Sequence, residues 1–476
     1  MEQNFITKEV YEQIKDFKSF HLSKEQKVIV DQLIPNEELK ERYKKFTLCK
    51  ECYQPCTKRR WCSPCIAKHF QDDFKNWTSE NIFVDKTIRD LQLKAEDNVK
   101  ILEWIEYDRF YDVEYLAKGG FGTVYKAKWK DGYIINWDVE NKQWKRFKDI
   151  AHRLGPDRMV VLKFLNDSQD ISPEFVKELG AHIEMNGSIY VIQCYGMSKD
   201  PKTKNFILVM DYQERGSIRY YLDKHFDSIY WEEKLYILQN IAEGLSRIHK
   251  RDLVHRDFHS GNILKGINFE ATITDLGLSR PAKELNRNGK NEIFGVLPYI
   301  APEVLQGKDY TEKSDIYSFG VLCYEVITGL RPHHDMAHDG HLALKIIKGF
   351  RPKFKIKVPK LLLDLINQCW DSDPSKRPNA ENISKMISPW REDLNIPNYE
   401  SEFYKQYDEA DEYNKTHKTT ESTELQQSID AQPAYQSHPQ AIYTSRILEP
   451  LSGELDLEIP DIDMDDCSND DDNDEE

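Results

Sequence analysis

One octapeptide limits what this chain can fold into more than any other feature of its sequence. Residues 255–262 read His-Arg-Asp-Phe-His-Ser-Gly-Asn, so four residues separate Asp257 from Asn262. In this pattern the aspartate can orient a hydroxyl and accept its proton, and the asparagine can hold a magnesium ion on the phosphates of ATP. A polar loop could produce the same letters by chance. That reading fails if partner motifs stand at matching places along the chain, and they do.

A glycine cluster lies upstream, where residues 119–122 read Gly-Gly-Phe-Gly between apolar flanks. The flanks predict a strand, a glycine turn and a second strand, whereas a dinucleotide-binding site needs a helix after the turn. Because glycine has no Cβ, its backbone amides can approach phosphate oxygens closely. The residues expected to contact a nucleotide here are Leu116, Ala117, Gly119, Gly120, Phe121, Gly122 and Val124.

Lys163 ends an apolar run at residues 160–162, where a charge has to be paired or desolvated at a cost. Taken alone, it could be a strand-end lysine that reaches solvent. With the glycine loop upstream, it is expected to grip the α- and β-phosphates of ATP. Glu178, near the start of an amphipathic helix, is its candidate partner, and its spacing favours it over Glu174 and Glu184.

Three further positions complete the pattern. Asp275 stands eighteen residues after Asp257, which favours a second magnesium ligand over an ordinary turn. Asp315 begins an apolar helix and is expected to accept hydrogen bonds from the backbone of the octapeptide. Glu303 and Arg377 are expected to form a buried ion pair with a structural role, and breaking such a pair costs roughly 3–5 kcal/mol.

In this order the motifs make residues 110–390 resemble a eukaryotic protein kinase domain. The resemblance implies an α+β fold with a β-rich N-lobe, a helical C-lobe, and ATP and Mg²⁺ between them. It implies that Lys163, Asp257, Asn262 and Asp275 are the catalytic residues, with Asn262 and Asp275 as the magnesium ligands. It also implies that residues 211–213, with Asp211 and Gln213, form the hinge that holds the adenine, and that Met210 is the gatekeeper at the back of the pocket, a role that plain core packing does not rule out.

Resemblances to narrower groups of protein kinases rest on short sequence motifs. Arg351-Pro352, Cys369-Trp370 and Arg377-Pro378 resemble the tyrosine-kinase-like group of protein kinases. Residues 295–303, together with the Cys-rich front end, resemble the expanded kinase family of arbuscular mycorrhizal fungi.

The implied activity is transfer of the γ-phosphate of ATP to a protein hydroxyl in intracellular signalling, with serine or threonine favoured as acceptor. Leu276 stands after Asp275 where the family usually has Phe, and four further positions depart from the family pattern. Ala117 replaces the first glycine, His259 and Val296 replace a Lys and a Thr usual in Ser/Thr kinases, and Tyr299 stands where tyrosine kinases have Trp. A tyrosine or dual-specificity kinase, and a catalytically weak binding scaffold, therefore remain alternatives.

Five of the nine cysteines fall within seventeen residues near the N-terminus. Cys49 and Cys52 form one Cys-x-x-Cys knuckle and Cys62 and Cys65 another, and two knuckles can supply four thiolates to a structural Zn²⁺. Cys56 is either a spare or replaces one of the four. Disulfides and a redox pair are the alternatives. The intervening residues 58–61 carry too few positive charges to predict nucleic-acid binding, so a protein partner is favoured for this module.

Composition sets the expected boundaries. Residues 1–45 read as a helical segment, 46–70 as the Cys-rich module, 71–109 as a helical connector and 391–476 as a disordered acidic tail. Residues 132–148 look like an inserted β-hairpin. Residues 451–476 contribute thirteen acidic side chains to the net charge of −16 and either solvate the chain or compete for a substrate groove. With no apolar span or signal segment, a cytoplasmic or nuclear protein is expected.

Overall fold

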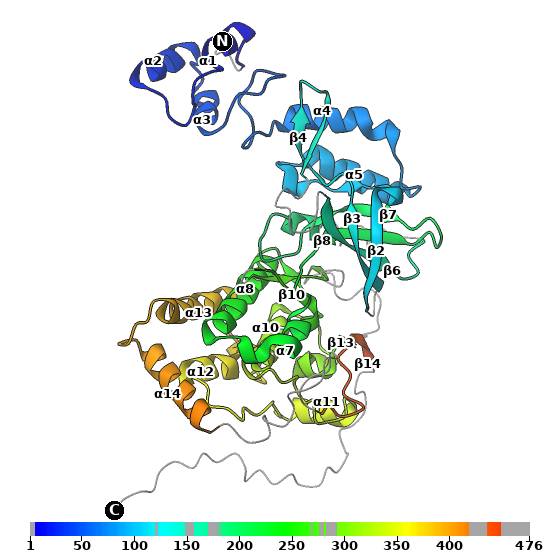
Figure 1. Ribbon diagram of the computed structural model, residues 1–476, viewed down its shortest axis with the longest axis vertical. Helices are drawn as coiled ribbons and strands as arrows, with labels where there is room; N and C mark the ends of the chain where they lie inside the picture. The colour runs from blue at the N-terminus through cyan, green and yellow to red at the C-terminus, as the bar shows by residue number, and fades with distance from the viewer. Residues whose placement is uncertain are drawn as a thin grey trace, which may run out of the picture.

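The computed structural model describes residues 5–119, 122–147, 157–169, 180, 182–267, 270–275, 280–281, 293–417 and 436–448. Along these residues the chain forms a helical N-terminal segment, a Cys-rich segment, a lobe built on a β-sheet and a larger lobe of helices (Figure 1). The sheet-based lobe followed by a helical lobe confirms the fold class predicted from the sequence. Within the described part, no helix is both long and apolar enough to cross a membrane.

Three short helices form the N-terminal segment, as the charge and apolar pattern predicted. They are α1 (Lys8–Ile14), α2 (Lys24–Leu33) and α3 (Glu37–Lys45). Each helix follows a residue whose side chain accepts a hydrogen bond from the first turn, namely Thr7, Ser23 and Asn36. The helices enclose a small core of Ile6, Ile14, Val30, Ile34 and Tyr43.

Two helices and a hairpin join the Cys-rich segment to the sheet. The helices are α4 (Ser63–Asp73) and α5 (Ile82–Lys94), and the hairpin is β4 (Tyr133–Asp138) with β5 (Gln143–Phe147). The hairpin contacts the sheet, because Tyr133 stacks on Tyr195 and Arg146 pairs with Glu103, while its two tryptophans lie against α4. Trp144 stacks on Phe70 and Trp137 stacks on His69, with ring centroids 4.4 and 3.9 Å apart.

The sheet has six strands in the order β1-β7-β8-β6-β3-β2. Their bounds are β1 (Glu103–Trp104), β2 (Phe110–Lys118), β3 (Gly122–Trp129), β6 (Arg158–Leu165), β7 (Cys194–Lys199) and β8 (Phe206–Asp211). β2 and β3 pair antiparallel on either side of the glycine cluster. The two predicted strands are therefore confirmed.

Each face of the sheet carries its own apolar core, because successive side chains of a strand point to opposite faces. On β6, Val160 and Leu162 join a core with Phe110 and Trp129. The opposite core contains Met197, Phe206 and Met210, and α5 covers it with Val84 and Ile88. This arrangement fixes the strand that carries Lys163.

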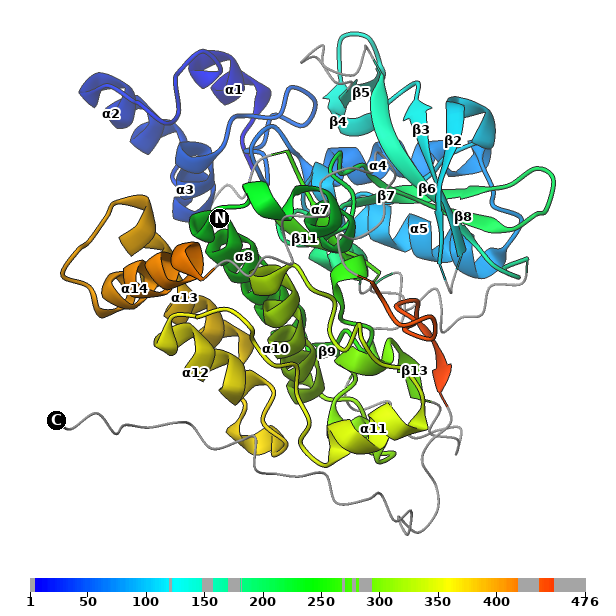
Figure 2. The same cartoon turned by 60° about the horizontal axis from the view of Figure 1, so that its bottom comes forward.

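The helical lobe is organised around two long helices, α8 (Trp231–His249) and α10 (Glu312–Thr328), which lie side by side (Figure 2). Its helices are α7 (Ile218–His225), α8 (Trp231–His249), α9 (Pro302–Leu305), α10 (Glu312–Thr328), α11 (Gly340–Ile347), α12 (Lys360–Cys369), α13 (Ala380–Asn395) and α14 (Glu402–Thr416). Every residue of α10 from Ser314 to Ile327 is buried, so α10 forms the centre of the lobe.

Three short strand pairs accompany these helices. β10 (Ile263–Lys265) pairs with β11 (Ala271–Ile273), β9 (Leu253–Val254) with β12 (Arg280–Pro281), and β13 (Ile293–Gly295) with β14 (Arg446–Leu448), all antiparallel. The first pair follows the octapeptide and ends just before Asp275. The third brings a segment from near the C-terminus onto the helical lobe (Figure 1).

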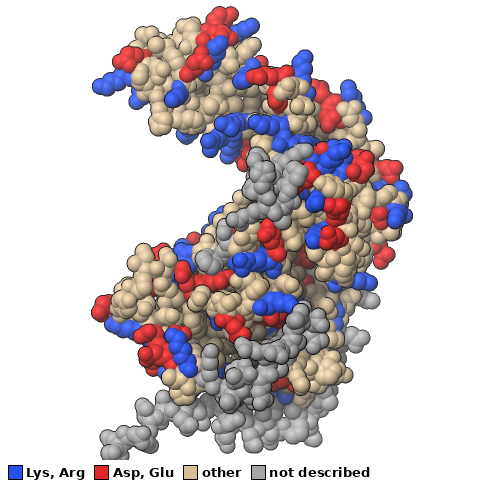
Figure 3. Space-filling view, in the orientation of Figure 1, with Lys and Arg blue, Asp and Glu red and all other residues tan. Residues whose placement is uncertain are grey.

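The prediction of disorder from residue 391 onward is wrong for two segments. Helix α14 packs on the lobe through Phe403, which stacks on Trp390 with ring centroids 5.0 Å apart. Strand β14 pairs with β13 over three residues. The acidic residues 451–476 lie outside the described part of the chain. On the face drawn in Figure 3, positive and negative side chains are interspersed over the N-terminal helices and both lobes.

Candidate active site

Lys163 and Asp275 meet where the two lobes face each other. Lys163 lies on β6 between Val124 of β3 and Leu208 of β8, and its side chain is 10% exposed. Its Nζ forms an ion pair with Oδ1 of Asp275, which follows β11 in the helical lobe. The structure therefore joins two residues that are 112 positions apart in the sequence.

Asp257 and Asn262 lie together at the base of the same site. The Asn262 Nδ2 group donates to the Asp257 carbonyl at 2.8 Å and to its Oδ2 at 3.2 Å. The backbone N–H of Thr274 donates to the Asn262 carbonyl at 2.9 Å, which holds neighbouring Asp275 beside the octapeptide loop. The four side chains predicted to act together thus converge on one place.

Asp315 fixes the conformation of the octapeptide loop from below. It is 1% exposed on α10, and its carboxylate accepts the backbone N–H groups of His255 at 2.8 Å and Arg256 at 3.0 Å. It also contacts Nε2 of His249 at 2.9 Å. Arg256 has a φ of 71°, a left-handed value. This conformation costs roughly 1–3 kcal/mol and persists only where surrounding contacts hold the backbone in place. The predicted role of Asp315 is therefore confirmed.

The electrostatic surroundings keep Asp257 ionised. The residue is only 4% exposed, and burial alone would raise the pKa of its carboxyl group. His259 and a hydrogen bond from the Ser445 hydroxyl outweigh burial and lower that pKa to about 2. Asp257 is therefore a carboxylate at neutral pH and can accept a hydrogen bond from a hydroxyl.

The glycine loop closes through its own backbone. Gly119 N–H donates to the Gly122 carbonyl at 2.9 Å. A Cβ at Gly122 would meet the Phe164 carbonyl oxygen at 2.1 Å, so only glycine lets β3 lie this close to β6. Ala117 pairs with Val124, and Leu116 is 41% exposed. Gly120 and Phe121 lie outside the described residues, as does Glu178, so the predicted Lys163–Glu178 pair is not described.

The predicted hinge follows β8. Met210 is 6% exposed and belongs to the core beneath α5, which is compatible with the predicted gatekeeper position. The Asp211 carboxylate accepts hydrogen bonds from Arg158 at 2.5 Å and Tyr195 at 3.0 Å. The Gln213 carbonyl accepts the Gly216 N–H at 3.2 Å. The side chain of Asp211 is thus turned towards the sheet.

Glu303 and Arg377 form the buried pair expected from the sequence. Arg377 is 1% exposed, and its two terminal nitrogens donate to the two carboxylate oxygens of Glu303 at 2.7 and 2.8 Å. Arg377 also donates to the carbonyls of Lys313 and Asp371, both at 2.8 Å. The pair ties α9 to α10 and to the end of α12.

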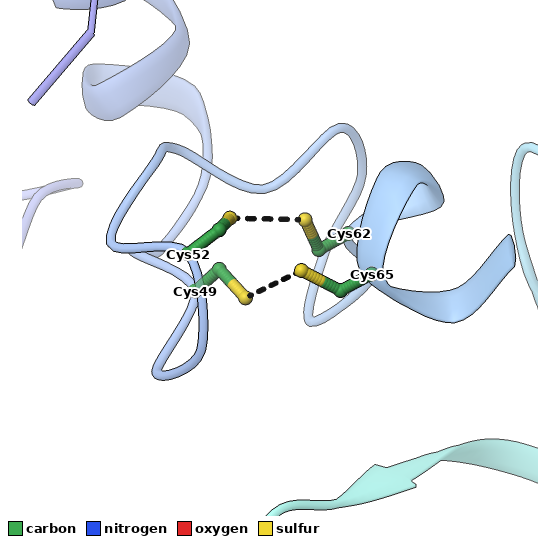
Figure 4. Close-up of side chains that lie close together, drawn as sticks. All are labelled: Cys49, Cys52, Cys62 and Cys65. Atoms are coloured by element: carbon green, nitrogen blue, oxygen red, sulfur yellow. Dashed lines mark hydrogen bonds between the residues drawn. The ribbon is translucent and has the colours of Figure 1, made fainter. Parts of the chain in front are cut away.

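Four of the five clustered cysteines converge in the Cys-rich segment (Figure 4). The Sγ atoms of Cys49 and Cys65 are 3.8 Å apart, those of Cys52 and Cys62 are 3.6 Å apart, and all four lie within 4.8 Å of one another. All four are free thiols. Cys56 is buried beside this group without belonging to it, and burial raises its pKa to about 11.

Sequence reasoning missed one residue of this site. Ser445, which precedes β14, donates from its Oγ to Asp257 Oδ2 at 2.7 Å. It was assigned to a disordered tail because the polar residues around it carry no periodic signal. The strand that brings it to Asp257 is only three residues long, and its partner β13 lies about 150 positions earlier.

A sheet-based lobe and a helical lobe with these four residues between them define a protein kinase domain. Comparison with protein families agrees, since the family described as protein tyrosine and serine/threonine kinase matches residues 112–387. The chain belongs to this family.

Curated relatives share this region. The Aurora kinase of Schizosaccharomyces pombe is 32% identical over 279 residues, which cover 58% of this chain and 69% of that protein. MDIS1-interacting receptor like kinase 2 of Arabidopsis thaliana is 31% identical over 317 residues, which cover 62% of this chain and 27% of the relative. The match spans only 16% of two longer relatives, one from Acanthamoeba polyphaga mimivirus and one from Dictyostelium discoideum.

Proposed function

We propose that this chain is an ATP-dependent protein kinase that phosphorylates serine or threonine. The observation that carries the proposal is the convergence of the Lys163–Asp275 ion pair with Asp257 and Asn262 between the lobes. A degenerate scaffold on the same fold commonly lacks one of these groups. All four are present here and lie close together, which favours the enzyme over the scaffold.

Each of the four side chains suits one task in phosphoryl transfer. Asp257, held as a carboxylate, orients the acceptor hydroxyl and accepts its proton. Lys163 is scarcely exposed, so its charge acts strongly on the phosphates. The oxygens of Asp275 and Asn262 are hard donors of the kind that Mg²⁺ prefers, and the ion would neutralise phosphate charge. The work is therefore positioning and electrostatics rather than covalent catalysis.

The preference for serine or threonine over tyrosine as acceptor is proposed from the limited space between Asp257 and the backbone that leads into β14. A serine hydroxyl already lies within hydrogen-bonding distance of this carboxylate, on a backbone that continues into β14. A tyrosine is longer by a phenyl ring and would push that backbone away from β13. The mimivirus and Dictyostelium discoideum relatives, whose names include the words serine/threonine-protein kinase, point the same way.

A peptide array tests this function. The purified chain with Mg²⁺-ATP is expected to phosphorylate Ser and Thr peptides and to leave Tyr peptides unlabelled, while Asp257→Asn labels none. Labelling confined to Tyr, or shared equally with it, would support the tyrosine or dual-specificity alternative. Equal background labelling by both proteins would support the binding scaffold.

We also propose that Cys49, Cys52, Cys62 and Cys65 hold one structural Zn²⁺. Four sulfurs at about 2.3 Å from a tetrahedral zinc lie about 3.8 Å from one another. The separations of 3.6 and 3.8 Å match that edge, whereas a disulfide requires about 2.05 Å. Zinc would connect the helical N-terminal segment to α4. We propose that this Cys-rich segment, residues 46–70, is a protein-binding module.

Metal analysis tests the zinc proposal. The purified chain is expected to carry about one zinc per molecule, and a chelator should remove it with loss of protease resistance in residues 46–70. Cys62→Ser should lose the metal, whereas the matched control Cys56→Ser should keep it. Equal zinc in both variants, or none in the wild type, would contradict the proposal.

The finer placement of the chain is a proposal as well. We place it in the tyrosine-kinase-like group, near the expanded family of arbuscular mycorrhizal fungi. The Arg351 side chain donates to the Trp370 carbonyl at 2.9 Å and to Ser372 Oγ at 3.1 Å. Two of the short motifs that support this placement, Arg351-Pro352 and Cys369-Trp370, are therefore in direct contact. Free thiols and the need for ATP favour the cytoplasm.

A further inference from the structure

A serine of this chain occupies the place where an acceptor hydroxyl would react. Ser445 Oγ lies 2.7 Å from Asp257 Oδ2 and 3.0 Å from His259 Nε2. The Nδ1 atom of His259 accepts the Gly261 N–H at 3.0 Å, so the ring carries a proton on Nε2. His259 therefore donates to the Ser445 oxygen, while the Ser445 hydroxyl donates its own proton to Asp257.

The chain on the C-terminal side of Ser445 is held by strand pairing. Arg446 pairs with Gly295, and the next two residues continue the register along β13. The Arg446 side chain also donates to the His338 carbonyl at 2.6 Å. These contacts set the backbone position from which Ser445 reaches Asp257.

The chain on the N-terminal side is anchored by one aromatic residue. Tyr443 is 7% exposed within the core of the helical lobe, and its hydroxyl donates to the Pro332 carbonyl at 2.9 Å. Arg219 donates to the Tyr443 carbonyl at 2.6 Å and to Ser260 Oγ at 3.2 Å. Arg219 thus joins the segment to the octapeptide loop.

Backbone contacts extend this hold farther upstream. The His338 N–H donates to the Gln440 carbonyl at 3.0 Å, the Ile442 N–H donates to His338 Nδ1 at 3.1 Å, and the His438 N–H donates to the His334 carbonyl at 2.7 Å. Residues 438–448 therefore lie along the helical lobe as a peptide substrate would, with Ser445 beside Asp257.

We propose that Ser445 is a phosphorylation site modified by the active site of its own molecule. The proposal rests on the proposed kinase function. The Ser445 oxygen attacks the γ-phosphorus of ATP, its proton passes to the Asp257 carboxylate, and the bond from that phosphorus to the β,γ-bridging oxygen breaks. ADP leaves and a phosphoserine ester remains, so no oxidant, reductant or further reactant is needed.

Phosphorylation then releases the segment. A phosphoserine carries a charge of roughly −1.5 to −2 at neutral pH. Ser445 is half-buried, and the charge on it would face the Asp257 carboxylate, which is itself only 4% exposed, so the two like charges repel. Residues 438–448 cover the acceptor position until that reaction occurs, and other substrates gain access afterwards.

The test uses the full chain, dephosphorylated and then mixed with Mg²⁺-ATP and a Ser/Thr peptide pool. Mass spectrometry is expected to find phosphate on Ser445, with a half-time that stays constant over a hundredfold range of protein concentration. Ser445→Ala and Asp257→Asn should lose this phosphate. Thr444→Ala, which removes the adjacent exposed hydroxyl, should keep it.

The outcomes separate the two proposals. Peptide labelling without phosphate on Ser445 would overturn this inference and leave the kinase function standing. A half-time that shortens in proportion to protein concentration would overturn modification within one molecule. Absence of labelling on both peptide and Ser445 would overturn the kinase function itself.

Release of the segment has its own readout. Preincubation with ATP is expected to lower the peptide KM of the wild type and of Thr444→Ala several-fold, with no effect on Ser445→Ala. Tyr443→Ala, which removes the anchor, should show the low KM before any preincubation. A peptide KM that is the same in all four proteins would contradict the covering role of residues 438–448.

Discussion

Burial acts differently on two ionisable residues of the helical lobe, Asp257 and His333. Asp257 is buried with partners that favour its charge, so it remains a carboxylate. His333, in the turn after α10, is 6% exposed and stacks on Phe350 with ring centroids 5.1 Å apart. Burial, helped by repulsion from His338, lowers the pKa of His333 to about 4. His333 is therefore neutral in the fold at pH 6, where an exposed histidine is largely charged.

The first prediction concerns stability against pH. The unfolded chain binds a proton at His333 near pH 6.5 and the folded chain only near pH 4, so stability is lost as pH falls between these values. The difference corresponds to ~3 kcal/mol. Denaturant unfolding should show that His333→Asn, which tolerates the left-handed φ of 53°, loses less stability over this range. The exposed control His341→Asn should behave as wild type, and equal slopes in all three would contradict the assignment.

At the scale of elements, the helical lobe depends on one ion pair. The Arg377 guanidinium binds both oxygens of Glu303 and two backbone carbonyls, so it satisfies groups from α9, α10 and the segment after α12. Because the pair is almost inaccessible to water, losing one partner leaves the other charged and unpaired.

Removing this arginine should destabilise the lobe. Arg377→Met is expected to lower the free energy of unfolding by about 3–5 kcal/mol. Lys385→Met, which breaks the exposed Lys385–Glu381 pair on α13, should change it by about 1 kcal/mol or less. Chemical denaturation compares the two, and a similar small loss for both would show that the buried pair contributes little. Adding Glu303→Leu to Arg377→Met should recover part of the loss.

The elements also show what could be read from the sequence and what could not. The residues of the β2–β3 hairpin, Lys163 and Asp315 each carry a local signal, namely glycines between strands, a charge after an apolar run and an aspartate starting an apolar helix. Local signals of this kind predicted the two strands and the single residues, whereas the two lobes and the convergence of the four side chains were implied by the resemblance to protein kinases. The aromatic contacts of the inserted hairpin with α4 depend on tertiary packing, which no local pattern encodes.

The segment at Ser445 was beyond such reasoning for a related physical reason. Its strand has three residues, too few for a periodic pattern, and it is stabilised by a partner strand far away in the sequence. A polar composition was read as disorder, although one buried tyrosine and a set of backbone hydrogen bonds are enough to hold the segment.

In the whole molecule, the proposed activity depends on contact between the lobes. Lys163 belongs to the sheet and Asp275 to the helical lobe, so their ion pair spans the site in which phosphoryl transfer is proposed. If both residues act on the same nucleotide phosphates, each loses its effect once the other is removed.

The most direct measurement is therefore the turnover of Lys163→Met, Asp275→Asn and the double variant with Mg²⁺-ATP and a Ser/Thr peptide pool. Each single variant is expected to lose about 10²–10³-fold in kcat. The effects of substituting residues that act as a unit do not add, so kcat of the double variant should be no lower than kcat of the less active single variant. Losses that multiply in the double variant, or single variants that turn over as fast as the wild type, would contradict the account.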